Sequence, residues 1–150
     1  MSGLERVRKL EVWHDAIILA RDIYELSATW PSDERYNIVS QIRRAAVSVS
    51  ANLAEGVGRD TPREMVRFSR IALGSLYEVD SFLEIAAALP SLLPADGDLR
   101  QSIVTLAKPL ESFIKYHEER GVGYVREDLG SEYLAEGHNQ EPKTRNQELM

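Results

Sequence analysis

Few residues in this chain have types and spacing that could support catalysis or hold a metal. Glu11 and His14 match the Glu-x-x-His element of di-iron helical bundles. Such a site needs a second copy of the element and two further inward carboxylates, and the sequence contains no second copy. His117 and His138 lack the spacing of zinc ligands. We therefore expect neither a metal nor another cofactor.

The chain contains neither a serine nucleophile elbow nor a phosphate-binding loop. No Gly-x-Ser-x-Gly element presents a serine, and the chain has no cysteine, which excludes thiolate chemistry and is compatible with a reducing cytoplasm. Gly56-x-Gly58 is neither a phosphate loop nor a dinucleotide fingerprint. It predicts a helix cap and a turn, or an anion site formed with Arg59, Arg63 and the next helix N-terminus. We expect no enzymatic activity.

Arginine, by contrast, recurs at a regular spacing in the middle of the chain. Arg63, Arg67 and Arg70 are four and three residues apart, which places them on one face of a helix. With Arg59 before them, they form a candidate contact for nucleic acid or another anion. One interpretation is a docking edge for a phosphate backbone or an acidic protein. The other is a solvated face whose arginines pair with neighbouring carboxylates, namely Glu55, Glu64 or Glu78.

The charge distribution gives support to both interpretations. The formal net charge of −6 argues against a protein generally coated by nucleic acid. Between residues 35 and 70, however, seven arginines face three carboxylates, so this stretch carries +4. Residues 121–150 carry −3. Phe68 is expected in the core, so the sequence does not indicate base stacking.

The stretch from Gln41 to Arg70 organises the elements around these residues. At about 100° per residue, one helical face is an apolar seam, made of Val39, Ile42, Ala46, Val49 and Leu53. The opposite face is a polar row, made of Gln41, Arg44, Ser48, Asn52 and Glu55. The row is either a solvated face or a polar seam between subunits. The mediocre helix formers Ser48 and Asn52 favour the subunit seam, and so do the flanking alanines.

Punctuation residues set the boundaries of this helix and the next one. We expect Ser32 to cap a helix that runs from Asp33 to about Glu55. Gly56 and Gly58 offer the positive φ that ends a helix. Thr61-Pro62-Arg63-Glu64 then predicts a new helix with a capping box.

Three further helices follow from the apolar periodicity. The first runs from Leu10 to about Thr29, the third from Pro62 to Leu89, and the fourth from Asp98, a candidate cap, to about Arg120. The predicted apolar face of the helix from Leu10 is made of Trp13, Ala16, Ile17, Ala20, Ile23 and Tyr24. That of the helix from Pro62 is made of Met65, Phe68, Ala72, Leu76, Val79, Leu83 and Ala86. That of the helix from Asp98 is made of Leu99, Ile103, Leu106, Leu110, Phe113 and His117.

Two residues are unusual inside these helices. Gly74 costs about 1 kcal/mol relative to alanine in a helix interior, which predicts close approach of another helix, with chance as the alternative. Pro109 removes a backbone donor and predicts a kink near Thr105.

The pattern predicts an all-α protein, an antiparallel up-down four-helix bundle with a disordered C-terminal tail. We divide it into a flexible arm (residues 1–9), the bundle (residues 10–120) and an acidic, mostly disordered tail (residues 121–150). The N-terminus has no long apolar run, so the sequence predicts neither a signal peptide nor a membrane span. We expect a cytoplasmic protein.

Several blocks of the sequence carry a resemblance to a known family. They are Leu10-x-Val12-Trp13, Ile23-Tyr24, Gln41-x-Arg43-Arg44-Ala45-Ala46-x-Ser48, Asn52-Leu53-Ala54-Glu55-Gly56 and Ile71-Ala72-Leu73-Gly74-Ser75-Leu76-Tyr77-Glu78. Over about residues 10–120 the chain resembles the four-helix-bundle proteins of intervening sequences in bacterial 23S rRNA genes. That family is similar to the accessory protein of diversity-generating retroelements, a basic pentamer that binds a reverse transcriptase and nucleic acid.

The resemblance implies a non-enzymatic, oligomeric scaffold, a homopentamer of four-helix bundles. The polar row is the candidate subunit contact on the evidence of its own residues. A nucleic-acid-binding accessory factor that uses the arginine edge is the alternative. The expected partners are copies of the chain itself, and either weakly bound RNA or DNA or an acidic protein.

Overall fold

The structure, a computed structural model, describes residues 1–136, and side chains as far as residue 121. Five α-helices form the described part, with one 3-10 turn and no strand, so the predicted all-α class is confirmed. The helices are α1 (Gly3–Arg8), α2 (Glu11–Ala28), α3 (Ile38–Gly58), α4 (Pro62–Ala88) and α5 (Gly97–Glu136), and the 3-10 turn is η1 (Ser32–Glu34).

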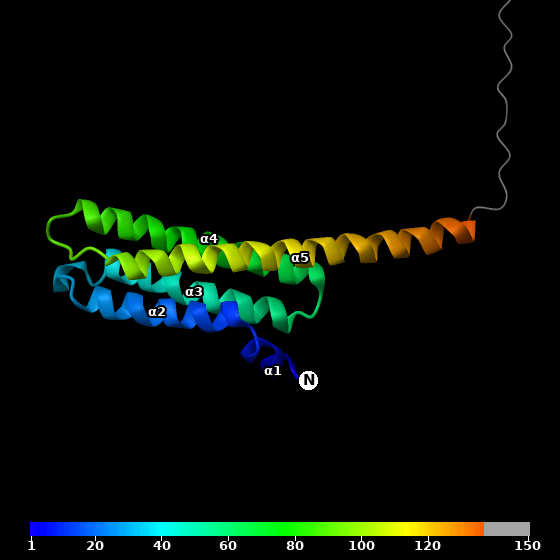
Figure 1. Ribbon diagram of the computed structural model, residues 1–150, viewed down its shortest axis with the longest axis horizontal. Helices are drawn as coiled ribbons and strands as arrows, with labels where there is room; N and C mark the ends of the chain where they lie inside the picture. Colours follow the sequence, from blue (N-terminus) through cyan, green and yellow to red (C-terminus); the bar gives the residue numbers. More distant parts are fainter. Residues whose placement is uncertain (137–150) are drawn as a thin grey trace, which may run out of the picture.

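The four long helices lie alongside one another, and successive helices run in alternating directions along the long axis (Figure 1). Helix α3 packs against α2 and α4, and α5 packs against α4 and α2. Helices α3 and α5 are therefore diagonal neighbours, and α2–α5 is the side of the molecule across from α3–α4. Beyond the other helices, α5 projects past the end where α1 lies (Figure 1).

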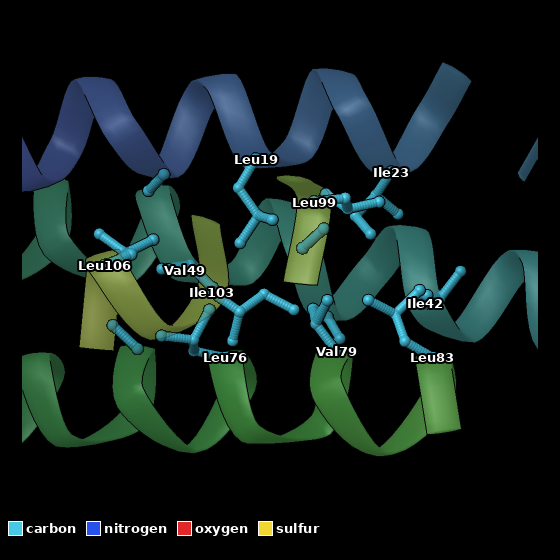
Figure 2. Close-up of a cluster of buried hydrophobic side chains, with 14 of the residues drawn as sticks. Leu19, Ile23, Ile42, Val49, Leu76, Val79, Leu83, Leu99, Ile103 and Leu106 are labelled. Atoms are coloured by element: carbon cyan, nitrogen blue, oxygen red, sulfur yellow. The ribbon is translucent and has the colours of Figure 1, made fainter. Parts of the chain in front are cut away.

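The core lies between these four helices, and the predicted seam on α3 is confirmed. Val39, Ile42, Ala46, Val49 and Leu53 are at most 6% exposed. Side chains from all four long helices interleave here, including Leu19, Leu76 and Ile103 (Figure 2). Each buried aliphatic side chain contributes about 1.5–3 kcal/mol, so this cluster is the main source of stability.

The predicted apolar face of α2 is wrong in part. Ile17 and Tyr24 are 41% and 45% exposed, whereas Val12 and Leu19, which the prediction omitted, are buried. Because α2 packs between α3 and α5, its buried row is centred on Leu19 rather than on the broader stripe. Ile17 and Tyr24 instead lie on a second apolar row that faces outward.

The predicted start of α3 is also wrong. Residues 32–34 form η1, and α3 begins at Ile38 instead of Asp33. The N-cap residue of α3 is Asn37 rather than Ser32, and no side-chain hydrogen bond caps the helix. Asn37 precedes the helix with φ −106° and ψ −115°, and its Nδ2 donates to the Asp33 carbonyl at 3.4 Å. A turn therefore replaces the first helical turn that the acidic residues suggested.

The α3–α4 connection differs from the glycine turn that we predicted. Gly56 and Gly58 stay helical, and the positive φ of 57° belongs to Asp60. Gly56 is needed for space, because a Cβ there would lie 3.1 Å from the Phe68 Cβ. The cap by Thr61 is confirmed, since its hydroxyl accepts from the Glu64 amide at 3.3 Å.

The predicted frayed arm contains helix α1. Ser2 and Glu5 form a capping box, with bonds of 3.2 Å and 2.6 Å to each other's backbone amides. Val7 is buried, and Arg6 pairs with Asp60 at 2.7 Å and donates to the Val57 carbonyl at 3.4 Å. This arginine thereby anchors α1 on the α3–α4 corner.

Helix α5 begins with a different cap and ends later than predicted. The Asp96 carboxylate, rather than that of Asp98, accepts from the Leu99 amide at 2.8 Å. The helix runs through Pro109 and past Arg120 to Glu136, the last residue that the structure describes, and no proline follows Pro109 in this stretch. Residues 137–150 of the predicted disordered tail lie outside the described residues.

Side chains hold the other connections in place. The Trp30 indole donates to the Leu93 carbonyl at 2.8 Å and ties the end of α2 to the α4–α5 loop. Ion pairs Arg70–Glu118 and Arg100–Glu84 and a 3.0 Å hydrogen bond from Tyr77 to Glu111 link α4 to α5.

Gly74 does not serve close packing. A Cβ at this position would meet nothing within 4 Å. The expected approach of another helix is therefore wrong, and nothing in the structure explains the glycine.

Candidate interaction face

A groove of about 960 Å³ lies between α3 and α4, and the end of α2 borders it. Of the predicted polar row, Gln41, Arg44 and Ser48 line this groove, whereas Asn52 and Glu55 lie further along α3 and do not. Helix α4 supplies a matching row at a spacing of four, three and four residues, made of Ile71, Ser75, Glu78 and Phe82. We call the surface of this groove and its rim the α3–α4 face.

Hydrogen bonds within the chain hold the floor of the groove together. The Ser75 hydroxyl donates to the Ser48 Oγ at 2.9 Å and so links α4 to α3. The Asn52 amide donates to the carbonyl and hydroxyl oxygens of Ser48 at 2.8 Å and 2.9 Å. Ser48 and Asn52 are half-buried, so these two members of the polar row bond inside one subunit.

The neighbouring arginines Arg43 and Arg44 have different surroundings. Arg43 donates to the Ser27 hydroxyl at 2.8 Å and to the Tyr24 carbonyl at 3.3 Å, and its guanidinium lies 4.5 Å from the centre of the Tyr24 ring. It therefore joins α3 to the end of α2. Arg44 is exposed in the groove, and no carboxylate of the described residues pairs with it.

The rim of the groove is apolar and aromatic. Val47 and Ile71 are each 43% exposed, and Tyr36 is 84% exposed. Arg35 adds a second cation near the start of α3. The α4 side of this surface was not predicted, although Ile71, Ser75 and Glu78 recur at a helical spacing in the sequence.

The arginine edge, which consists of Arg59, Arg63, Arg67 and Arg70, does not form one continuous surface of unpaired positive charge. Arg59 pairs with Glu55 at 2.7 Å, Arg67 lies 3.5 Å from Glu64, and Arg70 pairs with Glu118. The guanidinium groups of Arg59 and Arg67 also lie 5.7 Å and 5.4 Å from the centre of the Phe68 ring. The sequence correctly suggested Glu55 and Glu64 as partners, but Arg70 uses a residue of α5.

Arg63 differs from the other three arginines. It is exposed in the first turn of α4, and no carboxylate within residues 1–121 forms an ion pair with it. Its charge adds to the positive end of the helix dipole.

His117 lies in a smaller hollow of about 310 Å³ beneath the start of α4, with Arg6, Met65 and Arg120 among its neighbours. The Phe113 ring contacts it edge-on at a centroid distance of 4.5 Å. Burial, and then the charge of Arg120, lowers the pKa of His117 below the ordinary value of 6.5. A neutral imidazole is therefore favoured in the folded chain.

Among the residues that the structure describes, no group of three or more histidine or carboxylate side chains could hold a metal ion. Across the same residues, no helix combines the length and apolar character needed to cross a membrane.

These features define an all-helical protein with an amphipathic groove on its outer surface. The chain belongs to the family described as 23S rRNA-intervening sequence protein, which matches residues 8–112. A search of the curated proteins gave no match.

Proposed function

We propose that this protein is a non-enzymatic interaction protein that assembles with copies of itself through the α3–α4 face. The observation that carries the proposal is the groove itself, where exposed aliphatic side chains surround an arginine without a described ion-pair partner. The assembling unit is an antiparallel up-down four-helix bundle. We place it in the cytoplasm, where a chain without cysteine is at no disadvantage.

Exposed apolar area gives this face a reason to associate. Val47 and Ile71 are each 43% exposed, and Ile17 and Tyr24 lie on the adjoining row of α2. In an isolated subunit these apolar side chains stay in contact with water, which is unfavourable. Covering apolar surface is worth about 25 cal/mol per Å². A contact that covered the whole face would therefore stabilise an assembly.

Charge on the face favours a protein partner over a lipid or a small apolar molecule. Arg35 and Arg44 contribute positive charge to the groove, and Glu78 contributes negative charge. Such mixed charge sets the register of an interface and excludes wrong partners. The resemblance to ring-forming relatives suggests five copies in the assembly.

The test is light scattering coupled to size-exclusion chromatography on the full chain. We expect an oligomer for the wild type, and a shift towards monomer for Ile71→Asp because the substitution places a charge in the covered face. Val104→Asp is the matched control, since Val104 is 50% exposed on α5, away from the groove. A monomeric wild type at about 100 µM, where even weak specific interfaces associate, would refute the proposal.

A second candidate function is weak nucleic-acid binding at the arginine edge, and the exposure of Arg63 at the start of α4 favours it. We expect fluorescence anisotropy to detect binding of oligonucleotides at about 50 mM salt and its loss near 150 mM, because each phosphate contact releases counterions. Arg63→Glu with Arg67→Glu should abolish it without changing helicity. If neither the full chain nor a chain lacking residues 122–150 binds at low salt, this function is excluded.

A further inference from the structure

A row of acidic residues follows one face of α2. Glu11, Asp15, Asp22 and Glu25, with Ile18 between them, recur at spacings of four, three, four and three residues, so they share one line along the helix. Helix α2 carries four carboxylates and one arginine, a net charge of −3. The interior of the molecule uses a different line of α2, which includes Leu19 and Ile23.

This acidic row borders the α2–α5 side of the molecule. Asp15 and Ile18 line a hollow of about 240 Å³ with Asp98 of α5. Ile18 is 45% exposed. Asp22 pairs with Arg21 at 2.8 Å, and the other carboxylates of the row form no ion pair with described residues. We call this surface the α2–α5 face.

The two faces are opposite in both position and charge. Because α3 packs on α2 and α4 while α5 packs on α4 and α2, the α2–α5 face lies across the molecule from the α3–α4 face. The α3–α4 face presents Arg35 and Arg44 against one carboxylate, Glu78, and the α2–α5 face presents carboxylates around an exposed isoleucine. The two cations of the first face exceed its one carboxylate, and the second face carries an excess of carboxylates, so their net charges are complementary.

We infer that the α2–α5 face of one copy docks on the α3–α4 face of the next. The inference rests on the proposed self-assembly and names its two surfaces. Pairing two α3–α4 faces would bring Arg44 and Arg35 of both copies together, and like charges at an interface select against that arrangement. A contact between different faces is heterologous, so it leaves one free face of each kind and generates a closed ring or an open filament.

Charge reversal on each face separates this arrangement from a symmetric one. Variant A carries Asp15→Arg and Glu25→Arg, and variant B carries Arg35→Glu and Arg44→Glu. Each variant alone should show an apparent dissociation constant at least about a hundredfold higher than the wild type, because like charges then meet at every contact. An equimolar mixture of A and B should assemble again, since each altered face meets a complementary one.

The control is Asp80→Arg with Glu119→Arg, which makes the same charge change at exposed positions that line neither the groove nor the α2–α5 hollow and should assemble as the wild type does. Circular dichroism verifies that each variant is folded, and Asp15→Asn with Glu25→Gln is the milder replacement for variant A. Sedimentation velocity over a concentration series measures the assembly.

The outcomes distinguish the two proposals. If variant A alone assembles as the wild type does, the α2–α5 face is not used and the inference fails, while self-assembly through the α3–α4 face stands. If A and B both fail alone and their mixture also fails, complementary docking is refuted. If the wild type is monomeric, the proposed self-assembly fails first.

Discussion

Replacing glycine by alanine should have opposite effects on stability at Gly56 and Gly74, because the space around the two residues differs. Gly56→Ala should destabilise the chain by about 1–3 kcal/mol, the usual cost of overpacking, because the new Cβ would lie 3.1 Å from the Phe68 Cβ. Gly74→Ala should stabilise it by about 1 kcal/mol through helix propensity, since nothing lies within 4 Å. Urea unfolding of both variants measures the contrast, and a stable Gly56→Ala would show that α4 can shift.

His117 links the stability of the fold to pH. Its pKa is lowered in the folded chain from 6.5, so the unfolded chain binds the additional proton first as the pH falls. Stability from this group is therefore present above pH 6.5 and decreases as the pH drops towards the lower folded pKa. We expect thermal melts of His117→Gln to show a smaller loss between pH 7 and 5 than the wild type. Parallel curves for the two proteins would mean that His117 is not responsible.

At the scale of elements, Arg43 holds α2 and α3 together. Arg43→Ala removes the hydrogen bonds to Ser27 and to the Tyr24 carbonyl, and bonds from a charged group are worth about 1.5–3 kcal/mol. Arg44→Ala at an exposed position should change stability by less than about 0.5 kcal/mol. Urea unfolding at a protein concentration below assembly isolates this effect. Equal losses for the two variants would contradict the different roles assigned here.

The periodicity of the sequence predicted the buried face of a helix well where the helix has only one apolar row. On α3, the spacing of Val39, Ile42 and Leu53 was sufficient because the apolar side chains outside that row, such as Val47, form no second continuous row. On α2 the same reasoning selected Ile17 and Tyr24, because a helix with two apolar rows does not reveal which row the core uses. Helix α1 was missed because its six residues are too few for a periodic signal, although the Ser2 and Glu5 capping box was present in the sequence.

The candidate site was less predictable than the core. Gln41 and Arg44 do line the groove, and helical spacing separates Arg44 from Arg43, but the bonds of Arg43 to α2 have no signal in the sequence. Ion pairs within one helix, such as Arg59 with Glu55, follow from spacing. Pairs between distant helices, such as Arg70 with Glu118, depend on the packing of α4 against α5 and have no local signal.

For the whole molecule, we expect the core to end before the projecting part of α5. The last buried core residue of α5 within the described side chains is Ile114, and a Cβ at Gly121 would meet only Pro62, at 3.7 Å. Deleting residues 122–150 should therefore change the melting temperature by less than about 2 °C. A change of about 1 kcal/mol in the free energy of unfolding would shift it by roughly 2–8 °C for domains of this size range. Differential scanning calorimetry measures it, and a much larger decrease would place part of that segment against the helices.

The two tryptophans lie near opposite ends of α2, so their fluorescence can be used to follow each end of the molecule separately. Trp30, 6% exposed, donates its indole N–H at the α4–α5 loop. Trp13 lines the hollow beneath α1 at the other end of α2, beside Leu4 and Val7. Emission from chains with one tryptophan, Trp13→Phe or Trp30→Phe, would therefore follow separately the undocking of α1 and the opening of the α4–α5 loop, without any attached dye.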